Sequence, residues 1–364
     1  MVKQYMELKY PPSRRKSRPI KIGKVIIGGG FPIAIQSMTN TDTRDSESTV
    51  KQIQRLTDEG CDIIRVAVPD EAAAEKLREI KSKISIPLVA DIHFQYKLAL
   101  EAIRQGVDKI RINPGNIGED WKVREITQVA KSAGIPIRIG VNSGSLPKDL
   151  LEKYGHDDPE GFVLAALRQI EILENNDFHD IVISLKSTNV NTAYWAHMML
   201  AEKVDYPFHL GITEAGTLQT GVIKSAVGLG SILINGIGDT IRVSLTADPV
   251  EEIKAGKAIL KALELKKEGV EIISCPTCGR CQIDLISLAE SIEKKTRHYK
   301  TYLKVAVMGC VVNGPGEASA ADVGIAGGDG VGILFKKGKI VGKVAEKDLE
   351  ETLLKEIENM TKGL

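Results

Sequence analysis

The sequence lacks a large excess of charge of either sign, and its formal net charge is +1. In 364 residues, 49 lysines and arginines are balanced by 48 aspartates and glutamates. This balance argues against a protein that binds nucleic acid or a membrane surface through bulk basicity. Any anionic ligand must therefore be held by cations that are concentrated locally.

Long apolar runs are also missing. No stretch approaches the roughly 18 residues that a membrane-spanning helix needs, and the N-terminal segment contains no apolar core of signal-peptide length. We therefore expect a soluble cytoplasmic protein, in which structural disulfides are rare. Cysteines are few as well: there are five, and four of them follow residue 270, which favours metal binding over a disulfide framework. Cys61 begins an apolar strand and is expected to be a buried, inert thiol.

The length and the periodicity of the chain predict two domains, of which the first is a barrel. Between residues 33 and 266 a short β-rich run is followed by a helical run eight times, which is typical of a TIM (β/α)8 barrel; a doubly wound open sheet is the weaker alternative. The Gly-turned segment "KIGKVIIGGGFPIAI" is expected to form a hairpin that closes the barrel bottom. The expected strands are 33–38, 61–68, 87–93, 109–114, 136–142, 180–187, 207–214 and 239–246.

After Lys267 the pattern changes. A cysteine-bearing segment is followed by a helix ("IDLISLAESIEKKTR"), a strand ("LKVAVMG"), a Gly-rich bend, a hairpin-like pair ("VGILFKKGKIVGKV") and a terminal helix. This order predicts a small α+β domain. The expected domains are therefore 1–267, the barrel with its hairpin, and 268–364.

The predicted strands place many polar side chains in the barrel lumen. Side chains alternate between the two faces of a strand, so in "KIRINP" the apolar Ile110 and Ile112 face the helices, and Lys109, Arg111 and Asn113 face inward. The same phase applies to the other strands. It gives as inward residues Arg65, Asp91, His93, Arg138, Asn142, Ser184, Lys186, His209, Thr213, Arg242 and Ser244.

These inward cations need compensation, because buried charges are costly unless they are paired. For any single cation, a salt bridge to a neighbouring carboxylate is as good an explanation as a contact with a ligand. The two candidate carboxylates, Asp91 and Glu214, are however too few to neutralise the whole set of cations. We therefore expect a small, highly charged anion, and a diphosphate suits the planar guanidinium groups of arginine. Asp91 and His93 have no third ligand at useful spacing, which favours hydrogen bonding or proton transfer over metal binding.

Three cysteines lie within "SCPTCGRC" at C-x2-C-x2-C spacing, namely Cys275, Cys278 and Cys281. A tetrahedral zinc or a cubane iron-sulfur cluster needs four ligands. The next cysteine is Cys310 in "VMGCVVNGPGE", and Glu317 follows it. Spacing alone leaves two possibilities: all four cysteines, or the first, second and fourth with a non-thiolate partner.

Nine motifs occur in order along nearly the whole chain: "QSMTNTDT", "ADIHF", "RINPGNIG", "RIGVNSGSL", "SLKST", "GITEAG", "GDTIRVSLT", "SCPTCGR" and "GCVVNGPGEA". Through them the chain resembles the bacterial 4-hydroxy-3-methylbut-2-enyl diphosphate synthases, which are iron-sulfur enzymes of the non-mevalonate isoprenoid pathway. Its length resembles that of their short, two-domain form.

The resemblance implies a 4Fe-4S cluster on Cys275, Cys278 and Cys310, with Glu317 on the fourth iron. It departs from the family at Cys281, which is expected to be a bystander near the cluster. The implied reaction opens the ring of 2-C-methyl-D-erythritol 2,4-cyclodiphosphate and removes a hydroxyl group as water. Two electrons would come from a ferredoxin or a flavodoxin.

The resemblance also assigns roles in the barrel. Glu214 is a candidate for proton handling, and Asn113 is added from the strand phase. The residues that match the family's diphosphate-binding positions are Arg65, Arg111, Arg138, Asn142 and Lys186. Those that match other positions lining the same pocket are Asp91, His93, Glu214 and Ser244.

The geometry of a barrel predicts a homodimer. Substrate binds at the C-terminal ends of the strands, but the helix at about 249–266 ends at the opposite face, where the second domain begins. We expect each cluster domain to cap the partner's barrel. Two other interpretations stay open: a pterin-binding-type barrel enzyme, which does not need the cysteines, and an iron-sulfur carrier or scaffold, which leaves the cationic lumen unexplained.

Overall fold

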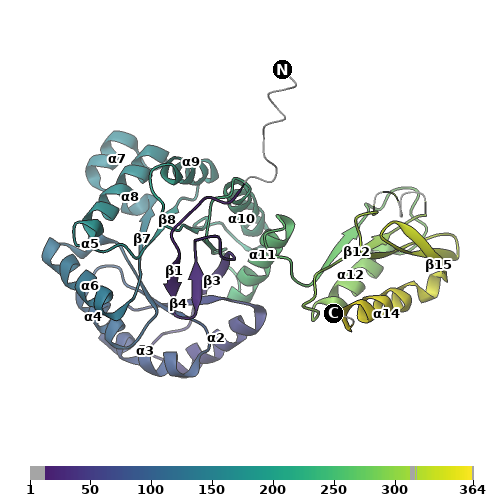
Figure 1. Ribbon diagram of the computed structural model, residues 1–364, viewed down its shortest axis with the longest axis horizontal. Helices are drawn as coiled ribbons and strands as arrows, with labels where there is room; N and C mark the ends of the chain where they lie inside the picture. The colour runs from purple at the N-terminus through teal and green to yellow at the C-terminus, as the bar shows by residue number, and fades with distance from the viewer. Residues whose placement is uncertain (1–12, 312–315, 317, 363–364) are drawn as a thin grey trace, which may run out of the picture. The chain divides into compact units, whose positions relative to one another are not determined.

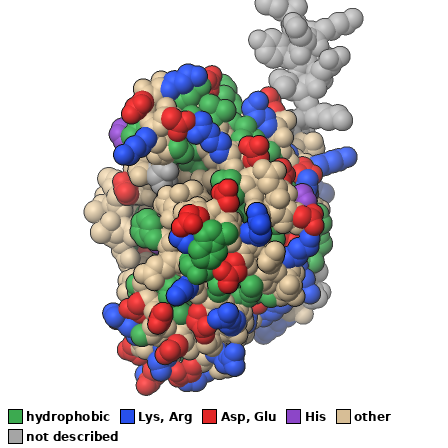
Figure 2. Space-filling model, turned by 90° about the vertical axis from the view of Figure 1, so that its left-hand side faces the viewer, with side chains coloured by type: hydrophobic (Ala, Val, Ile, Leu, Met, Phe, Trp, Pro, Cys, Tyr) green, Lys and Arg blue, Asp and Glu red, His purple; other side chains and the backbone are tan. Residues whose placement is uncertain are grey.

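The computed structural model describes residues 13–311, 316 and 318–362. The chain divides into two compact units, Met1–Lys266 and Lys267–Leu364. No helix in the described part is long and apolar enough to cross a membrane. Figure 2 shows one face of the molecule, on which lysine and arginine side chains are interspersed with aspartate and glutamate. This face therefore carries no broad field of one charge, as the balanced composition suggests.

The first unit is a barrel of parallel strands surrounded by helices (Figure 1). Its strands are hydrogen-bonded in the order β8-β7-β6-β5-β4-β3-β10-β9, and a parallel bridge between Ile183 and Phe208 joins the two ends of this order. An open sheet would leave these ends apart, so the predicted TIM barrel is confirmed. The strands are β3 (Ala34–Met38), β4 (Ile63–Ala67), β5 (Leu88–Asp91), β6 (Lys109–Ile112), β7 (Ile137–Asn142), β8 (Ile181–Lys186), β9 (His209–Leu210) and β10 (Thr240–Ile241).

The barrel helices begin and end at residues suited to these positions. Asp45 accepts a hydrogen bond from the backbone N–H of Ser48 at the start of α2, and Gly60 ends that helix at a φ of 104°. The buried sides of the helices pack on the outward side chains of the strands in one large core. The helices are α2 (Ser46–Glu59), α3 (Glu71–Lys83), α4 (Tyr96–Arg104), α5 (Pro114–Ile117), α6 (Asp120–Ala133), α7 (Lys148–Tyr154), α8 (Pro159–Glu174), α9 (Val190–Ala201), α10 (Leu218–Leu233) and α11 (Pro249–Ala262), with a 3-10 turn at η1 (Ser143–Ser145).

An antiparallel hairpin of β1 (Ile20–Ile22) and β2 (Val25–Ile27) closes the N-terminal end of the barrel. Its buried isoleucines pack against the first inward side chains of four strands, so the bottom of the lumen is apolar. The hairpin prediction is thereby confirmed. The packed residues are Ile20, Ile22, Ile27, Ala34, Ile63, Val89 and Val182.

The second unit contains a five-stranded sheet in the order β11-β12-β13-β14-β15. The first three strands are parallel, and β14 is antiparallel to both of its neighbours, β13 and β15. One face packs against α12 and α14 through a core that includes Ile292, Leu353 and Ile357. The elements are β11 (Val270–Ser274), α12 (Leu285–Thr296), β12 (Leu303–Met308), β13 (Val323–Ala326), β14 (Val331–Lys336), β15 (Lys339–Ala345), η2 (Glu346–Asp348) and α14 (Leu349–Lys362).

Two strands of this sheet were not predicted. β11 lies in the stretch expected to be only a cysteine-bearing segment, and β13 lies in the expected Gly-rich bend. Each is short and lies between glycines or cysteines, which masks the periodicity of the sequence. Hydrogen bonding to a neighbouring strand stabilises both of them, because β11 and β13 pair with the two edges of β12.

Candidate active site and thiol cluster

The predicted inward phase places a set of buried polar side chains inside the barrel. Lys109, Arg138 and His209 are at most 1% exposed, and Arg111 and Arg65 are also buried. Their neighbours along the strands, such as the isoleucines of β6 and β7, belong to the outer core instead. The lumen above the apolar bottom layer is therefore lined by charged groups.

Asp91 connects three of these groups. Its carboxylate lies 3.2 Å from Nη1 of Arg111, 3.7 Å from Nε of Arg65 and 3.6 Å from Nε2 of His93. Burial by itself would raise the pKa of Asp91, but the charge of Arg65, the hydrogen bond from His93 and the charge of Arg111 hold it below its usual value. Asp91 is thus ionised and shared by two arginines.

A second buried carboxylate was missed by the sequence analysis. Glu252, in the first turn of α11, lies 3.5 Å from Nε of Arg242 and accepts a hydrogen bond from the hydroxyl of Ser37 at 3.0 Å. The prediction had assigned compensation to Glu214, which is exposed at a positive φ of 50°. The residue that compensates Arg242 is Glu252, which reaches the lumen because α11 packs against β3.

Compensation in the lumen remains incomplete. Among the described residues, two buried carboxylates, Asp91 and Glu252, face six basic side chains, four of which are arginines. Burial lowers the pKa of Arg65 to about 10, which is still above neutral pH. The lumen therefore carries a surplus of positive charge that an anion would neutralise. The six basic side chains are those of Arg65, Lys109, Arg111, Arg138, Lys186 and Arg242.

Two glycines lie close to the lumen residues, and one of them leaves room for a long side chain. A Cβ atom at Gly140 would lie 3.2 Å from Nε of Arg111 and 3.1 Å from the hydroxyl of Ser184. A Cβ atom at Gly211 would lie 3.1 Å from the backbone carbonyl oxygen of Arg242, and its distance of 3.6 Å from Nζ of Lys186 would be ordinary van der Waals contact. Contacts near 3.1 Å are closer than ordinary packing permits, so the glycine in "RIGVN" sets the position of the Arg111 guanidinium.

The remaining predicted residues lie around the C-terminal ends of the strands. Asn142 in its hydrogen-bonded orientation accepts from Nη2 of Arg111 at 3.3 Å, and Ser244 is half-buried. His93 is exposed over half of its side chain, at 54%. Asn113 caps α5, since its side chain accepts from the N–H of Gly115 at 3.2 Å. The structure thus brings the predicted barrel residues to one end of the lumen, although Asn113 also has a local structural role.

The thiols gather at one edge of the second sheet. Cys275 follows β11 and Cys310 lies two residues after β12, and the parallel register pairs Ser274 with Val307, so both thiols lie at the same strand ends. The backbone N–H of Gly309 donates to Sγ of Cys275 at 3.2 Å. A Cβ atom at Gly309 would lie 2.6 Å from Sγ of Cys281. Residues about 30 positions apart in the sequence therefore surround one glycine.

Cys278 differs from its neighbours because it is exposed. Hydrogen bonding from the backbone of Arg280 holds the pKa of Cys278 below its usual value, which favours the thiolate that binds metals. No group of three His, Cys, Asp or Glu side chains within the described ranges has a metal-binding arrangement. Glu317, the predicted fourth ligand, lies outside the described residues. The available donors are soft thiols at one sheet edge, and this donor set suits an iron-sulfur cluster.

Cys61 has the properties of an inert thiol. It is buried at the base of β4, and its Sγ lies 3.1 Å from the carbonyl oxygen of Ile63. Burial raises the pKa of Cys61 to about 12, so the thiol stays protonated at neutral pH.

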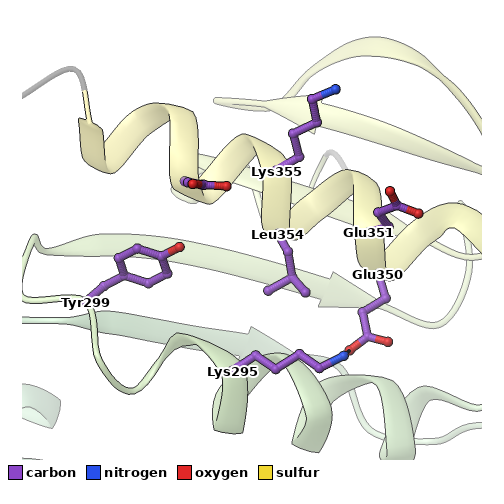
Figure 3. A pocket seen from close by; sticks show the side chains of 7 residues that line it. Lys295, Tyr299, Glu350, Glu351, Leu354 and Lys355 are labelled. Atoms are coloured by element: carbon purple, nitrogen blue, oxygen red, sulfur yellow. Dashed lines mark hydrogen bonds and ion pairs between the residues drawn. The ribbon is translucent and has the colours of Figure 1, made fainter.

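A surface groove lies between α12 and α14 in the second unit (Figure 3), with a volume of about 620 Å³. Lys295 and Glu350 line it and form an ion pair of 2.8 Å across it. The groove is also lined by Leu354, Tyr299 and further charged side chains of α14. Lysine and glutamate side chains lie next to each other in the groove. It therefore has no concentration of one charge like that in the barrel lumen.

Comparison with known proteins covers both units. The family model described as the GcpE TIM-barrel domain matches residues 17–257, and that of the GcpE protein C-terminal domain matches residues 271–359. A 4-hydroxy-3-methylbut-2-en-1-yl diphosphate synthase (flavodoxin) from Caldanaerobacter subterraneus subsp. tengcongensis is 62% identical over 96% of this chain and 98% of its own. The protein of that name from Clostridium perfringens is 59% identical over 96% of this chain and all of its own.

A solved structure shares the barrel alone. Dihydropteroate synthase from Stenotrophomonas maltophilia superposes with a TM-score of 0.50 at 17% sequence identity. The match covers 68% of this chain and 98% of the other. At this identity the likeness shows a common fold, in agreement with the strand order described above.

Proposed function

The chain belongs to the GcpE family, and we propose from this that it is a flavodoxin-dependent 4-hydroxy-3-methylbut-2-en-1-yl diphosphate synthase. The resemblance predicted from the motifs is thereby confirmed at the level of the family. The proposed reaction is the reductive ring opening and dehydroxylation of 2-C-methyl-D-erythritol 2,4-cyclodiphosphate. The observation that carries it is an undercompensated cationic lumen in the same chain as a thiol-rich sheet edge.

The lumen residues would bind the diphosphate. Arg111 and Lys186 are buried close to the C-terminal ends of β6 and β8, where barrel enzymes bind substrate, and the buried Arg138 of β7 is paired in register with Arg111. Nε and Nη1 of Arg138 have no hydrogen-bond partner within the described structure, so they are available to phosphate oxygens. A charge-assisted bond to a buried guanidinium is among the stronger polar contacts in proteins. The cyclic diphosphate would thus satisfy donors that the protein leaves unpaired.

The second unit would hold the redox group. Cys275, Cys278 and Cys310 would bind a 4Fe-4S cluster, with Glu317 as the proposed fourth ligand. Such a cluster, when bound, supplies single electrons and a Lewis-acidic iron. The N–H of Gly309 already donates to Sγ of Cys275, and a hydrogen bond of this kind to a ligating sulfur raises the reduction potential of a cluster.

Proton delivery is the remaining requirement. Conversion of the cyclic diphosphate dianion to a linear diphosphate trianion and water consumes two electrons and one proton. We assign the proton to Glu214, because it is exposed beyond β9 on the substrate side of the barrel. The electrons would come from a flavodoxin, which the names of the relatives include. A cytoplasmic location stays a prediction from the sequence.

The proposed function is tested by anaerobic purification followed by three measurements: a visible spectrum, an iron count, and a reductive assay with the cyclic diphosphate and reduced flavodoxin. We expect cluster absorption, about four irons per chain, and formation of the linear diphosphate. An iron-loaded protein that passes electrons on but leaves the cyclic diphosphate unchanged would instead indicate a carrier or scaffold. Full iron-free activity on a pterin substrate would indicate the other alternative.

We also propose that two chains form each active site. Nζ of Lys257, in the second half of α11, donates to the carbonyl oxygen of Glu59, just before β4 begins. The helix therefore runs towards the N-terminal ends of the strands, away from the lumen cations. Only four residues lie between its last residue, Ala262, and the start of the second unit at Lys267, and the five Cα–Cα steps reach at most about 18 Å. A second copy would supply the cap without this restriction.

An apolar stripe on the barrel supports pairing of two copies. Ile223 and Val227 on α10 and Ile234 just after it are 60%, 57% and 51% exposed, and their spacing places them on one side of the helix. Trp195, on the neighbouring α9, is 55% exposed. An exposed apolar stripe of this kind is typical of an interface, and a second chain related by a twofold axis would cover it with the same stripe.

Mixing two inactive variants tests this assembly. Lys186→Ala removes a lumen cation and Cys310→Ser removes a proposed cluster ligand, so each homodimer is expected to be inactive. After random reassortment half of the dimers are heterodimers, each with one intact site if the caps act in trans. We therefore expect roughly a quarter of wild-type activity. An inactive mixture in which mass spectrometry shows heterodimers would mean that each domain caps its own barrel.

A further inference from the structure

Lys109 is the most deeply buried lysine of the barrel. It has no exposed surface, and it precedes Arg111 by two residues on β6, which places it about 7 Å deeper in the lumen. Its Nζ lies 3.3 Å from Oε1 of Gln36, a neutral group. Lys109 therefore lies below the ends of the strands where the diphosphate would bind, and it does not line that site.

The charged groups that face Lys109 are cations. Those acting on it are Arg138 from β7 and Arg65 from β4. The buried His209 on β9 faces the same space, with Nδ1 bonded to the hydroxyl of Thr240 at 2.7 Å. The carboxylate on β5, Asp91, is already shared by two arginines. Lys109 is therefore buried among like charges with one neutral acceptor.

In such an environment a lysine loses its proton more readily than an arginine. Arginine stays charged in proteins, whereas burial can lower the pKa of lysine by several units. Burial, followed by the charges of Arg138 and Arg65, lowers the pKa of Lys109 well below its usual value. A diphosphate that binds above Lys109 adds negative charge to the same lumen. This charge raises the pKa of Lys109.

We propose that Lys109 is uncharged in the ligand-free lumen and takes up one proton from solvent when the diphosphate binds. This inference rests on the proposed function, because the cyclic diphosphate is the ligand. The protonated Lys109 then adds a cation directly below the phosphate groups, although it does not contact them. Lys109 is thus a positioning residue that adjusts the charge of the lumen to its content.

The sign of the pH dependence follows from linkage. If the complex holds one more proton than the free protein and ligand, affinity falls as the pH rises. The slope is about tenfold per pH unit between the pKa of Lys109 in the free lumen and its higher pKa in the complex. The phosphodiester oxygens of the cyclic substrate stay ionised at neutral and alkaline pH, so they do not contribute to this slope.

Calorimetry measures this proton directly. The cyclic diphosphate is titrated into anaerobically purified, oxidised full-length protein at about pH 8, in several buffers that differ in their enthalpy of ionisation. The binding enthalpy plotted against the buffer enthalpy gives the number of protons taken up. We expect net uptake in the wild type, and close to one proton less in Lys109→Met, which keeps the aliphatic stem. Lys254→Met, on the outside of α11, is the matched control and should not change the proton count.

Three outcomes separate the possibilities. Equal proton uptake on binding in wild type and Lys109→Met overturns the proposal. If proton uptake falls in Lys186→Met alone, the proton taken up belongs to Lys186. An absence of binding heat in the wild type would contradict the proposed substrate instead. Should Lys109→Met fold poorly, the wild type still decides: an affinity that is independent of pH from about 7 to 9 would refute the proposal.

Discussion

Replacing Cys310 with serine is expected to remove both the iron-sulfur cluster and all detectable synthase activity, whereas Cys281→Ser should leave both close to wild type. Cys310 is buried just beyond β12, at the sheet edge that it shares with Cys275. A serine hydroxyl is a poor ligand for a soft cluster iron, because thiolates are preferred there. Loss of one of three thiolates leaves too few soft donors to hold the cluster.

Cys281 provides a matched comparison at the same site. Its Sγ donates to the carbonyl oxygen of Ile283 at 3.3 Å and packs beside Leu285 in the core of the second unit. A serine hydroxyl can keep this hydrogen bond, so we expect iron content and activity within about twofold of wild type. Iron analysis and visible absorption under anaerobic conditions measure both variants. Equal loss of the cluster in the two would show that four thiolates hold it.

Alanine substitutions of the lumen cations should raise KM by about a hundredfold or more, as expected when a buried charged partner is removed from a ligand. Arg111, Arg138 and Lys186 lie in the barrel, whereas the thiols lie in the second unit. The cluster spectrum should therefore stay unchanged in all three variants. Arg55→Ala removes an exposed cation paired with Asp248 and serves as the control with normal kinetics.

Two of these variants should differ in stability. Arg111→Ala removes one of the two arginines on Asp91, so it should lower the free energy of unfolding. Among the described residues Arg138 forms no ion pair, and the repulsion from Arg65, Arg111 and Arg242 opposes the attraction of Asp91, so Arg138→Ala should be neutral or stabilising while it still weakens binding. Steady-state kinetics and thermal unfolding measure the two effects separately. A normal KM in all three lumen variants would refute the diphosphate site.

Most of the barrel could be predicted because its signals are local. All eight barrel strands lie inside the predicted ranges, and the hairpin of β1 and β2 begins one residue before the segment predicted for it. The strands β9 and β10 have only two residues each, although longer runs were expected. Beyond them single backbone hydrogen bonds continue, such as that from the N–H of Arg242 to the carbonyl oxygen of Leu210 at 2.9 Å, but they form no regular ladder.

Parts of the site could not be predicted, because they depend on contacts between distant segments. Glu252 belongs to a helix whose sequence looks ordinary, and only the packing of α11 on β3 brings it to Ser37 and Arg242. Met38 was not singled out either, although its sulfur lies 2.9 Å from Nη2 of Arg65. Neither residue type at these positions signals a role in the lumen.

The sequence by itself determined which side chains face the lumen and which thiols are available, because alternation along a strand and cysteine spacing are properties of short segments. Only the tertiary structure decided which of the charges are compensated. Asp91 meets Arg65 and Arg111 across strands, and Glu252 meets Arg242 from a helix. Within the described structure, Lys109 instead lies among Arg65, Arg138, His209 and the neutral amide of Gln36. Charge pairing depends on distances of a few ångströms between residues far apart in the chain, and closure of the barrel sets those distances.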